Sequence, residues 1–321
     1  MAQLPAALLG AIDALAAENE RASLARDAQA ISESYRLRTG RGERLLTRES
    51  EAAAYAAARM PATYAAAHAA LSEALLSAGI APRTLLDCGA GTGAVSWAAD
   101  DLLVLTVVTC LEREDAMRAA GQRLMRAGSD TLRAARWETC DLTQDAPLPT
   151  AELVCEGYML GELPETMRLP AAARLWDAAE QLAVFIEPGT PQGFANLRAV
   201  RDMLLARGAH IAAPCPAGAG ACPMTGEDWC HFAVRVQRTQ LHRALKGGDA
   251  PYEDEKFCYL AAMRGEPENA CMSRVLRHPQ IAPGRIGVTI CEGGAIAERT
   301  FTKKDTQWKQ VRKIAAGDRI E

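Results

Sequence analysis

The feature that most constrains the fold of this chain is a glycine turn between a hydrophobic segment and a helical one. The segment 84–102, TLLDCGAGTGAVSWAADDL, reads as a strand, a turn with Gly89, Gly91 and Gly93, and a helix. Glycines let backbone amides approach a cofactor closely, because no Cβ stands in the way. The pattern predicts the nucleotide-binding turn of a doubly wound α/β sheet.

Two acidic residues follow later strands at positions suited to the same cofactor. Glu112 ends the strand VVTCLERED, where doubly wound sheets place the acid that binds ribose hydroxyls, and Asp141 ends a third strand, ETCDL, within reach of an adenine edge. The GxGxG spacing after Asp87 resembles the S-adenosylmethionine motif of class I methyltransferases more than the GxGxxG of NAD enzymes. The alternative is a Rossmann-like domain that no longer binds its cofactor, but the set is intact. The predicted S-adenosylmethionine ligands are Asp87, Gly89, Gly91, Gly93, Glu112 and Asp141.

Two further predicted strands, AELVCEGYMLGELPE and LAVFIEPGTPQG, complete the expected sheet. Ligands bind outside the carboxyl ends of such strands. We therefore expect Tyr158 and Glu187 near the cofactor's methyl group or the substrate, with Glu156 and Glu162 as the candidate catalytic acids. The first of these segments lacks the Asn-Pro-Pro-aromatic signature of methyltransferases that act on exocyclic base amines. The methyl acceptor cannot be read from it.

Alanine-rich helical patterns fill residues 1–80, ahead of the sheet. Pro61 lies inside the second helical block and predicts a kink or break there. An arginine cluster separates the two blocks, and it is either part of a helical layer over the sheet or a phosphate-contacting face. The sequence leaves both interpretations open. The cluster consists of Arg36, Arg38, Arg41, Arg44 and Arg48.

Composition and charge exclude several classes of protein. No apolar run reaches the roughly 20 residues of a membrane span, and the N-terminus has neither the basic start nor the cleavage site of a secretory signal. We expect a cytoplasmic protein of bacterial type without membrane association, monomeric when free. The net charge of -4 argues against a uniformly basic nucleic-acid binder but allows a local basic face.

The chain has ten cysteines, too widely spread for a disulfide scaffold. Cys88, Cys110, Cys140 and Cys155 fall in apolar, strand-like segments, where we expect buried small side chains. The remaining cysteines lie beyond the predicted sheet and call for a different explanation.

A Gly- and Pro-rich loop, 213–232, contains Cys215, Cys222 and Cys230. Because it has few apolar side chains, three thiolates converging on a metal or cluster would explain its order better than packing. The spacing is wider than in most zinc ribbons and favours an iron-sulfur cluster, with zinc as the alternative. The candidates for a fourth ligand are Cys258, Cys271, Cys291 and His231.

Cys291 is favoured as the fourth ligand. It ends the segment VTICEGG at a strand edge followed by two glycines, where a side chain can turn toward a shared site. Cys258 lies in an apolar strand, where a buried thiol is ordinary. His231 directly follows Cys230, and adjacent residues rarely both point inward.

Basic residues after the loop are consistent with RNA contact. In the segment HFAVRVQRTQLHRALKGG, four of them are expected on one side of a helix, partly paired with the acidic YEDEK; they are Arg235, Arg238, Arg243 and Lys246. The last segment predicts short strands that close a small β domain over the cluster. Its tail interleaves Trp308 with cations, a pattern that suits phosphate contact and base stacking or, alternatively, a solvated tail with one packed tryptophan. These cations are Lys303, Lys304, Lys309, Arg312 and Lys313.

Several strings together resemble the Rsm-twenty-two family, methyltransferase-like proteins of the mitochondrial small ribosomal subunit and their bacterial relatives. They are AYAAARMPATYAA, LLDCGAGTGA, EPGTPQGF, APCP, DWCHF, YEDEKFCYL and SRVLRHPQ. The resemblance implies a class I methyltransferase fold and association with small-subunit ribosomal RNA or the pre-ribosomal small subunit. It also implies a four-iron four-sulfur cluster on Cys215, Cys222, Cys230 and Cys291. One departure is Ala217, where the family often has His after the first Cys-Pro.

These observations predict an α/β chain in three parts. The expected parts are an N-terminal helical region (1–80), an S-adenosylmethionine-type Rossmann-like domain with the cysteine loop (81–265) and a small β domain with a basic tail (266–321). Two functions stay open. One is an S-adenosylmethionine-dependent rRNA methyltransferase in which Glu156 or Glu162 orients the acceptor. The other is a noncatalytic rRNA-binding factor in ribosome assembly or translation, with a structural or redox-sensing cluster.

Overall fold

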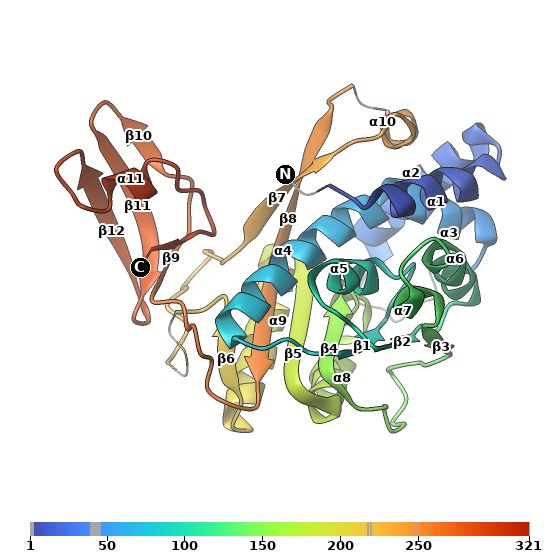
Figure 1. Ribbon diagram of the computed structural model, residues 1–321, viewed down its shortest axis with the longest axis horizontal. Helices are drawn as coiled ribbons and strands as arrows, with labels where there is room; N and C mark the ends of the chain where they lie inside the picture. The colour runs from blue at the N-terminus through green and yellow to red at the C-terminus, as the bar shows by residue number, and fades with distance from the viewer. Residues whose placement is uncertain (1–2, 39–45, 217, 219, 248, 321) are drawn as a thin grey trace.

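The fold is organised by two β-sheets of different size, seen in a computed structural model (Figure 1). The structure describes residues 3–38, 46–216, 218, 220–247 and 249–320, and for residues 34–38 the backbone alone. In the described chain the larger sheet has eight strands, ordered β3-β2-β1-β4-β5-β8-β6, with β7 paired to β8. Its strands are β1 Thr84–Cys88, β2 Val107–Leu111, β3 Arg136–Glu138, β4 Ala151–Gly157, β5 Ala179–Pro188, β6 His210–Ala213, β7 Phe232–Gln237 and β8 Tyr252–Met263.

The direction of the strands identifies the fold class. β1 is parallel to β2 and β4, β4 is parallel to β5, and β8 runs antiparallel to both β5 and β6. A central parallel set with a reversed strand next to one edge is the strand arrangement of class I methyltransferases, as predicted. It brings the carboxyl ends of β1, β2, β4 and β5 to one edge of the sheet, which is where ligands bind in such folds.

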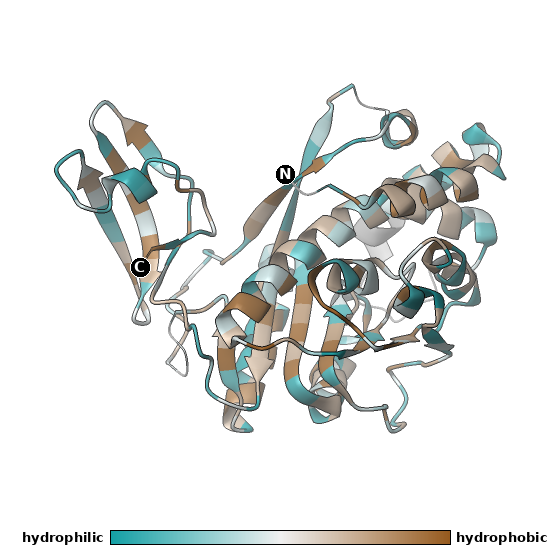
Figure 2. Ribbon diagram, in the orientation of Figure 1, coloured by the Kyte–Doolittle hydropathy of each residue, from teal (hydrophilic) through white to brown (hydrophobic). Residues whose placement is uncertain are grey.

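Helices cover both faces of the larger sheet. On one face, α4 and α5 pack against the sheet, and α1, α2, α3 and α6 add residues to the same buried cluster, which includes the strand residues Leu85 and Val184. On the other face, α8 and α9 pack against the neighbouring strand residues Leu86 and Phe185. Successive strand residues point to opposite faces, and both faces are covered, so most residues of the central strands are apolar (Figure 2). The helices are α1 Ala6–Ala17, α2 Arg21–Arg38, α3 Glu49–Ala58, α4 Met60–Ala78, α5 Ala94–Leu102, α6 Asp115–Met125, α7 Asp130–Arg133, α8 Glu165–Ala178 and α9 Pro191–Ala206, with a single 3-10 turn at η1 Leu160–Glu162.

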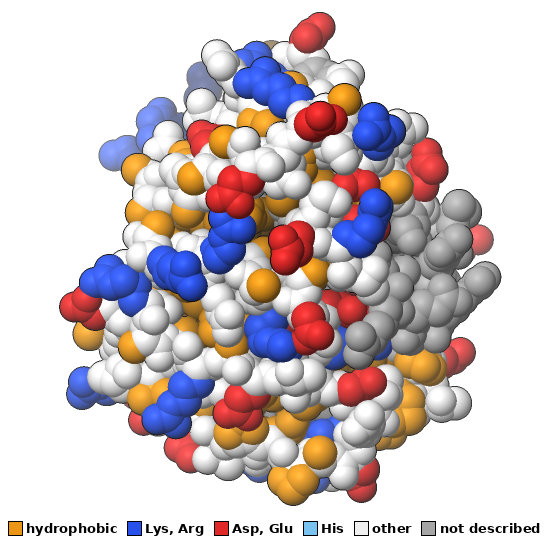
Figure 3. All heavy atoms as spheres, turned by 90° about the vertical axis from the view of Figure 1, so that its right-hand side faces the viewer, with side chains coloured by type: hydrophobic (Ala, Val, Ile, Leu, Met, Phe, Trp, Pro, Cys, Tyr) orange, Lys and Arg blue, Asp and Glu red, His pale blue; other side chains and the backbone are white. Residues whose placement is uncertain are grey.

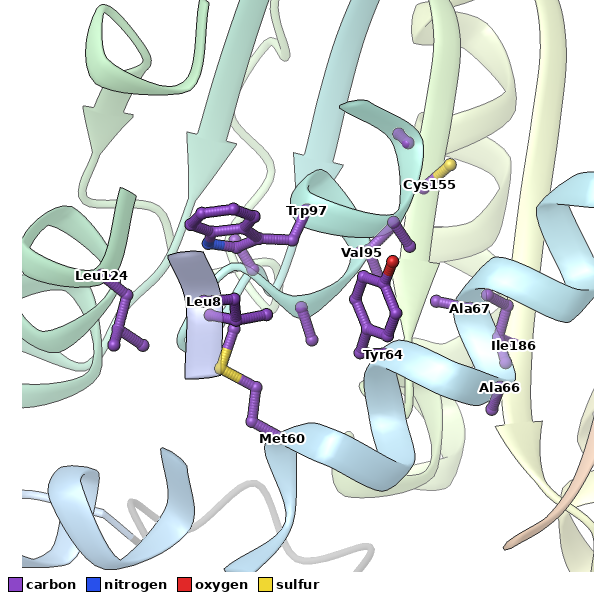
Figure 4. Close-up of a cluster of buried hydrophobic side chains, with 14 of the residues drawn as sticks. Leu8, Met60, Tyr64, Ala66, Ala67, Val95, Trp97, Leu124, Cys155 and Ile186 are labelled. Carbon is purple, nitrogen blue, oxygen red and sulfur yellow. The ribbon is translucent and has the colours of Figure 1, made fainter. Parts of the chain in front are cut away.

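Of the N-terminal helices, α4 packs against the sheet, and α1 to α3 pack on other helices. The break expected at Pro61 is confirmed, because α3 ends at Ala58 and Pro61 lies in the first turn of α4, where its missing N–H costs nothing. Leu8 of α1, Met60 of α4 and Trp97 of α5 belong to one buried cluster (Figure 4). None of the helices in the described residues has the length and apolar character to cross a membrane.

A second sheet in the described chain has five strands, ordered β10-β11-β9-β13, with β12 paired to β11. Its own core consists of Val275, Ile286, Val288, Ile290, Phe301, Val311 and Ile320. Trp308, at the start of α11, is half-buried against this core, which supports the packed-tryptophan interpretation of the tail. The elements are β9 Ser273–Val275, β10 Gln280–Ala282, β11 Arg285–Glu292, β12 Ala295–Thr302, α11 Trp308–Val311 and β13 Arg319–Ile320.

One buried arginine joins the two sheets. Arg274 of β9 is 1 % exposed and donates from Nε to the carbonyl of Pro214 (2.7 Å), which belongs to the cysteine loop. Its Nη1 donates to the carbonyl of Gly317 (2.6 Å), and its Nη2 donates to Oε2 of Glu73 in α4 (3.1 Å). Arg274 therefore attaches the second sheet to both the cysteine loop and α4, and Arg319 of β13 also pairs with Glu73 (3.1 Å).

The expectation that four basic residues line one helix after the cysteine loop is wrong. Arg235 lies in β7, Arg238 follows that strand, and Arg243 and Lys246 lie in α10 (Gln240–Lys246). Antiparallel pairing of β7 with β8 fixes the strand. The predicted pairing with the acidic segment is confirmed: the ion pairs are Arg235 with Asp254, and Arg238 and Lys246 with Glu253.

Candidate functional site

A cavity of about 530 Å³ opens at the carboxyl edge of the larger sheet. Its walls come from the glycine turn, from the ends of β2, β4 and β5, and from α3 and α9. The predicted site residues that line it are Gly89, Gly91, Glu112, Asp141, Tyr158, Glu162 and Glu187. Asp87, Gly93 and Glu156 lie behind the wall and do not line it.

The glycine turn has the backbone that its sequence predicts. Gly89, Gly91 and Gly93 have φ of 69°, 56° and 86°, which L side chains rarely adopt. A Cβ at Gly89 would lie 2.7 Å from Cγ of Met159, and one at Gly93 would lie 2.6 Å from Cε of Met125. The turn needs glycine because of its positive φ angles and because neighbouring side chains leave no room for a Cβ at Gly89 and Gly93. As a result, backbone atoms of the turn lie at the cavity wall.

Asp87 supports the turn from behind. It is fully buried, and its Oδ2 accepts hydrogen bonds from the backbone N–H (3.1 Å) and the hydroxyl (2.7 Å) of Ser96 in α5. Burial raises the pKa of this carboxyl to about 6, although the hydrogen bonds from Ser96 oppose the rise. The side chain links β1 to α5 by these hydrogen bonds. It can affect a bound ligand only indirectly, by holding the glycine turn in place.

Glu112 lies across the glycine turn and faces the cavity. Its Oε2 accepts from the N–H of Gly91 (2.7 Å) and its Oε1 from the N–H of Glu114 (2.8 Å). A carboxylate has about four acceptor positions, so lone pairs remain for a ligand hydroxyl. Asp141 also lines the cavity, but it follows the end of β3 by three residues, and its Oδ1 accepts from the N–H and hydroxyl of Thr143.

The three other carboxylates have different surroundings. Glu156 is fully buried and accepts from the N–H groups of Met159 (3.1 Å) and Ile186 (3.2 Å), so it joins β4 to β5 rather than facing the cavity. Glu187 accepts from Nδ2 of Asn196 (3.2 Å), and burial raises its pKa to about 7. Burial and the nearby Glu187 raise the pKa of Glu156 well above its usual range. Of the two candidate catalytic acids, Glu162 alone lines the cavity.

Tyr158 has a strained backbone at the cavity wall. Its φ of 64° is the single positive value among the described non-glycine residues, and such a conformation costs about 1–3 kcal/mol. Its hydroxyl donates to Oε1 of Glu255 (3.1 Å), which also pairs with Arg59 (3.5 Å) between α3 and α4. Arg59 and Asn196 line the cavity and were missed at the sequence level; Arg59 lies within the string AYAAARMPATYAA, which could have identified it.

Part of the arginine cluster of the N-terminal region lies outside the described residues. Arg41 and Arg44 lie outside the described residues, as do the side chains of Arg36 and Arg38. Arg48 pairs with Asp27 (3.0 Å) and Glu51 (2.9 Å). On the face that Figure 3 shows, the described basic and acidic side chains are interspersed. The described part gives no single-sign patch on that face.

A second cavity, of about 60 Å³, lies under the cysteine loop. It is lined by the four predicted ligands Cys215, Cys222, Cys230 and Cys291, and also by Cys258. The other two candidates for the fourth ligand do not line it: Cys271 donates to the carbonyl of Ser273, and His231 stacks on Trp229. Ala217 lies outside the described residues.

The sulfurs share this cavity without forming a finished metal site. No group of three or more His, Cys, Asp or Glu side chains in the described residues has an arrangement that would hold a metal ion. All ten cysteines are free. Of the four expected to be buried in strands, Cys140 is the exception, because it is half-buried and lines the larger cavity.

Burial disfavours the thiolate form of two cysteines that line this cavity, Cys230 and Cys291. It raises the pKa of Cys230 to about 12 and that of Cys291 to about 11, and the neighbouring cysteines act in the same direction. Arg274 opposes this rise at Cys230, and Arg201 opposes it at Cys291. At neutral pH a bound metal would be needed to convert such thiols to thiolates.

Comparison with known proteins places the chain among its relatives. It is 28% identical over 233 residues to the human protein described as "Ribosome assembly protein METTL17, mitochondrial", over 67% of this chain and 49% of that protein. The chain thus spans about half the length of this curated relative. Among solved structures, magnesium protoporphyrin IX methyltransferase from Synechocystis PCC 6803 with bound SAM is 12% identical, with a TM-score of 0.41 over 77% of this chain and 98% of that one. The plantazolicin methyltransferase BpumL with SAH is 11% identical, with a TM-score of 0.42 over 80% of this chain and 99% of that one.

The family assignment rests on most of the chain. A sequence model of the family described as "Mitochondrial small ribosomal subunit Rsm22" matches residues 49–321. This range includes the glycine turn, the cysteine loop and the second sheet. The resemblance seen in the sequence is confirmed, and the chain belongs to the Rsm22 family.

Proposed function

We propose that this chain is a ribosome assembly protein that binds S-adenosylmethionine in the larger cavity, holds an iron-sulfur cluster in the cysteine cavity and acts at small-subunit ribosomal RNA. The observation that carries the proposal is that four cysteines from two distant segments line one cavity. The human relative is described as a ribosome assembly protein, which supports a role in ribosome assembly for this chain.

The larger cavity suits a nucleoside cofactor. The glycine turn presents backbone at the wall, and Glu112 retains acceptor positions for ribose hydroxyls. Asp141 also lines the cavity and is the side chain we expect to contact an adenine edge. The cofactor, when bound, supplies an electrophilic methyl group. The chain's own part is to bind and orient it, while Tyr158 and Glu162 line the space next to the glycine turn.

The cysteine cavity suits a soft metal or a cluster. Four thiol groups are the ligand set of zinc and of four-iron four-sulfur clusters, and the spacing in the loop favours the cluster. Cys258 differs from Cys215, Cys222, Cys230 and Cys291, because its Sγ lies 3.2 Å from the carbonyl of Pro188 and donates to it. To bind a metal, Cys258 would have to lose its proton and this hydrogen bond, so we assign the site to the other four.

The first test is purification without oxygen, with a visible spectrum and iron, sulfide and zinc analysis. We expect broad absorption near roughly 400 nm with iron and sulfide, lost in Cys291→Ser and kept in the matched control Cys258→Ser. A colourless protein that holds one zinc would replace the cluster by a structural metal. A protein with no metal would refute the cysteine site.

The alternative is a noncatalytic assembly factor, and one observation favours it: Glu156 is engaged with backbone and does not line the cavity. The variant Gly91→Arg would fill the turn and prevent cofactor binding, as measured by calorimetry with S-adenosylhomocysteine. If ribosome assembly fails in cells that carry this variant, cofactor binding is required. If assembly proceeds normally, the noncatalytic function holds.

RNA contact is proposed for the exposed cations of the C-terminal tail. Lys303, Lys304 and Lys309 are exposed on the second sheet's side of the molecule. Reversing all three charges should weaken binding to small-subunit ribosomal RNA and flatten its salt dependence, because fewer counterions are released. Unchanged affinity at low salt would refute this surface.

A further inference from the structure

The cysteine cavity has a distinctive charge environment. Among the described residues that line it, three are arginines and none is acidic; the arginines are Arg198, Arg201 and Arg274. Two of them, Arg201 and Arg274, are buried, and burying a cation is costly unless an anion balances it. The lining therefore favours a negatively charged occupant.

Arg201 of α9 contacts the cysteine loop directly. It is 5 % exposed, and its Nη2 donates to the carbonyls of Gly218 (2.8 Å) and Gly220. These carbonyls lie between Cys215 and Cys222 in the chain, so the guanidinium holds the part of the loop that separates two predicted ligands.

One donor of Arg201 is unused. Its Nε is buried and has no hydrogen-bond partner among the described residues. Leaving a buried donor unpaired costs about 1–3 kcal/mol, and more for a charged group. The acid that pairs with Arg201 is the adjacent Asp202 at 3.3 Å, whose side chain is largely exposed.

Arg274, which also lines the cavity, provides a contrast. Its Nε, Nη1 and Nη2 each have an acceptor, in Pro214, Gly317 and Glu73. The two buried arginines therefore differ: Arg274 has these nitrogens engaged by the protein, whereas Nε of Arg201 has no acceptor among the described residues.

We propose that Arg201 is a positioning residue for the metal-sulfur group of the cysteine cavity: its Nε–H donates to a sulfur of that group, and its charge offsets the group's negative charge. The inference rests on the proposed function, since it needs an occupant in this cavity. Hydrogen bonds to the sulfurs and nearby positive charge stabilise the reduced, more negative state of a cluster, so Arg201 raises its reduction potential.

The test compares Arg201→Met, Arg201→Lys and the matched control Arg207→Met. Arg207 follows the last residue of α9 and pairs with the surface residue Asp177, so its replacement makes the same chemical change away from the cavity. The proteins are purified without oxygen, and binding of S-adenosylhomocysteine in the other cavity checks that each variant is folded.

Two quantities are measured on the loaded proteins. The first is the rate of iron or zinc transfer to a chelator, expected to rise about 10- to 100-fold in Arg201→Met, as is typical when a residue that supports metal ligands is lost. The second is the reduction potential of the cluster, which is expected to be more negative in Arg201→Met than in wild type. The potential of Arg201→Lys should lie between those two values, because lysine keeps the charge and lacks the Nε–H. A purely structural role in the loop would leave the potential unchanged.

The outcomes separate the inference from the proposed function. If wild type carries the metal or cluster, and Arg201→Met has the same transfer rate and reduction potential, the role of Arg201 is overturned and the proposed function stands. If purified wild type contains no iron, sulfide or zinc, both the proposed cysteine site and the role of Arg201 are overturned. If Arg201→Met fails to fold, Arg201→Lys decides: wild-type transfer rate and potential in that variant overturn the proposed Nε–H donor.

Discussion

The buried carboxyl of Asp87 makes the stability of this protein depend on pH in a direction that can be calculated. Its pKa is about 6 in the folded chain and 3.8 in its ordinary state, chiefly because burial disfavours the charged form. Since the folded state holds the proton more tightly, it binds more protons than the unfolded state between these values. Stability contributed by this group is therefore complete below about pH 4 and is lost as the pH rises to about 6.

The size of the effect follows from the same values. One pKa unit corresponds to 1.36 kcal/mol, so a rise from 3.8 to about 6 costs the folded state about 3 kcal/mol at pH 7. Asp87→Asn removes the titration and keeps the shape, and its carbonyl still accepts from Ser96. Relative to wild type, the variant should gain about 3 kcal/mol between pH 4 and pH 7.

The assay is urea unfolding of both proteins, in the same metal state, at several pH values between 4 and 8. Subtracting the two free energies of unfolding at each pH removes the contributions of the other carboxyls to first order. The reasoning is refuted if the difference is constant across this range, or if wild type gains on the variant as the pH rises. The second result would mean that Ser96 lowers the pKa of Asp87 more than burial raises it.

Three further changes test other parts of the fold. Gly93→Ala should destabilise the chain by about 1–3 kcal/mol, since it forces a side chain to φ 86° and toward Met125; an unchanged midpoint in thermal unfolding would contradict the role of the turn. Arg274→Met should cost about 1–3 kcal/mol, because it leaves the carbonyls of Pro214 and Gly317 without their buried donor, and hydrogen exchange should rise first in the second sheet. Trp229→Phe removes the bond from Nε1 to the carbonyl of Gly189 (3.0 Å) and should cost about 0.5–1.5 kcal/mol, seen as faster proteolysis within the cysteine loop if the contact holds that loop.

Local patterns in the sequence predicted much of the fold. The turn at Gly89, Gly91 and Gly93 was predictable because its backbone depends on a few adjacent residues, and the break at Pro61 because proline cannot donate in a helix interior. The segment after the cysteine loop was predicted as one helix and is β7 followed by α10, since pairing with β8, a segment later in the chain, overrides the local pattern.

The sequence by itself determined a doubly wound sheet with a glycine turn and a cysteine-rich loop, because these features depend on the spacing of neighbouring residues. Only the tertiary structure decided that Glu156 supports the sheet while Glu162 faces the cavity, and that Cys291 lines the same cavity as the loop. It also decided that Nε of Arg201 is buried with no acceptor among the residues that the structure describes. The physical reason is that burial and hydrogen-bond partners are set by segments far apart in the chain, and no local pattern records which of them meet.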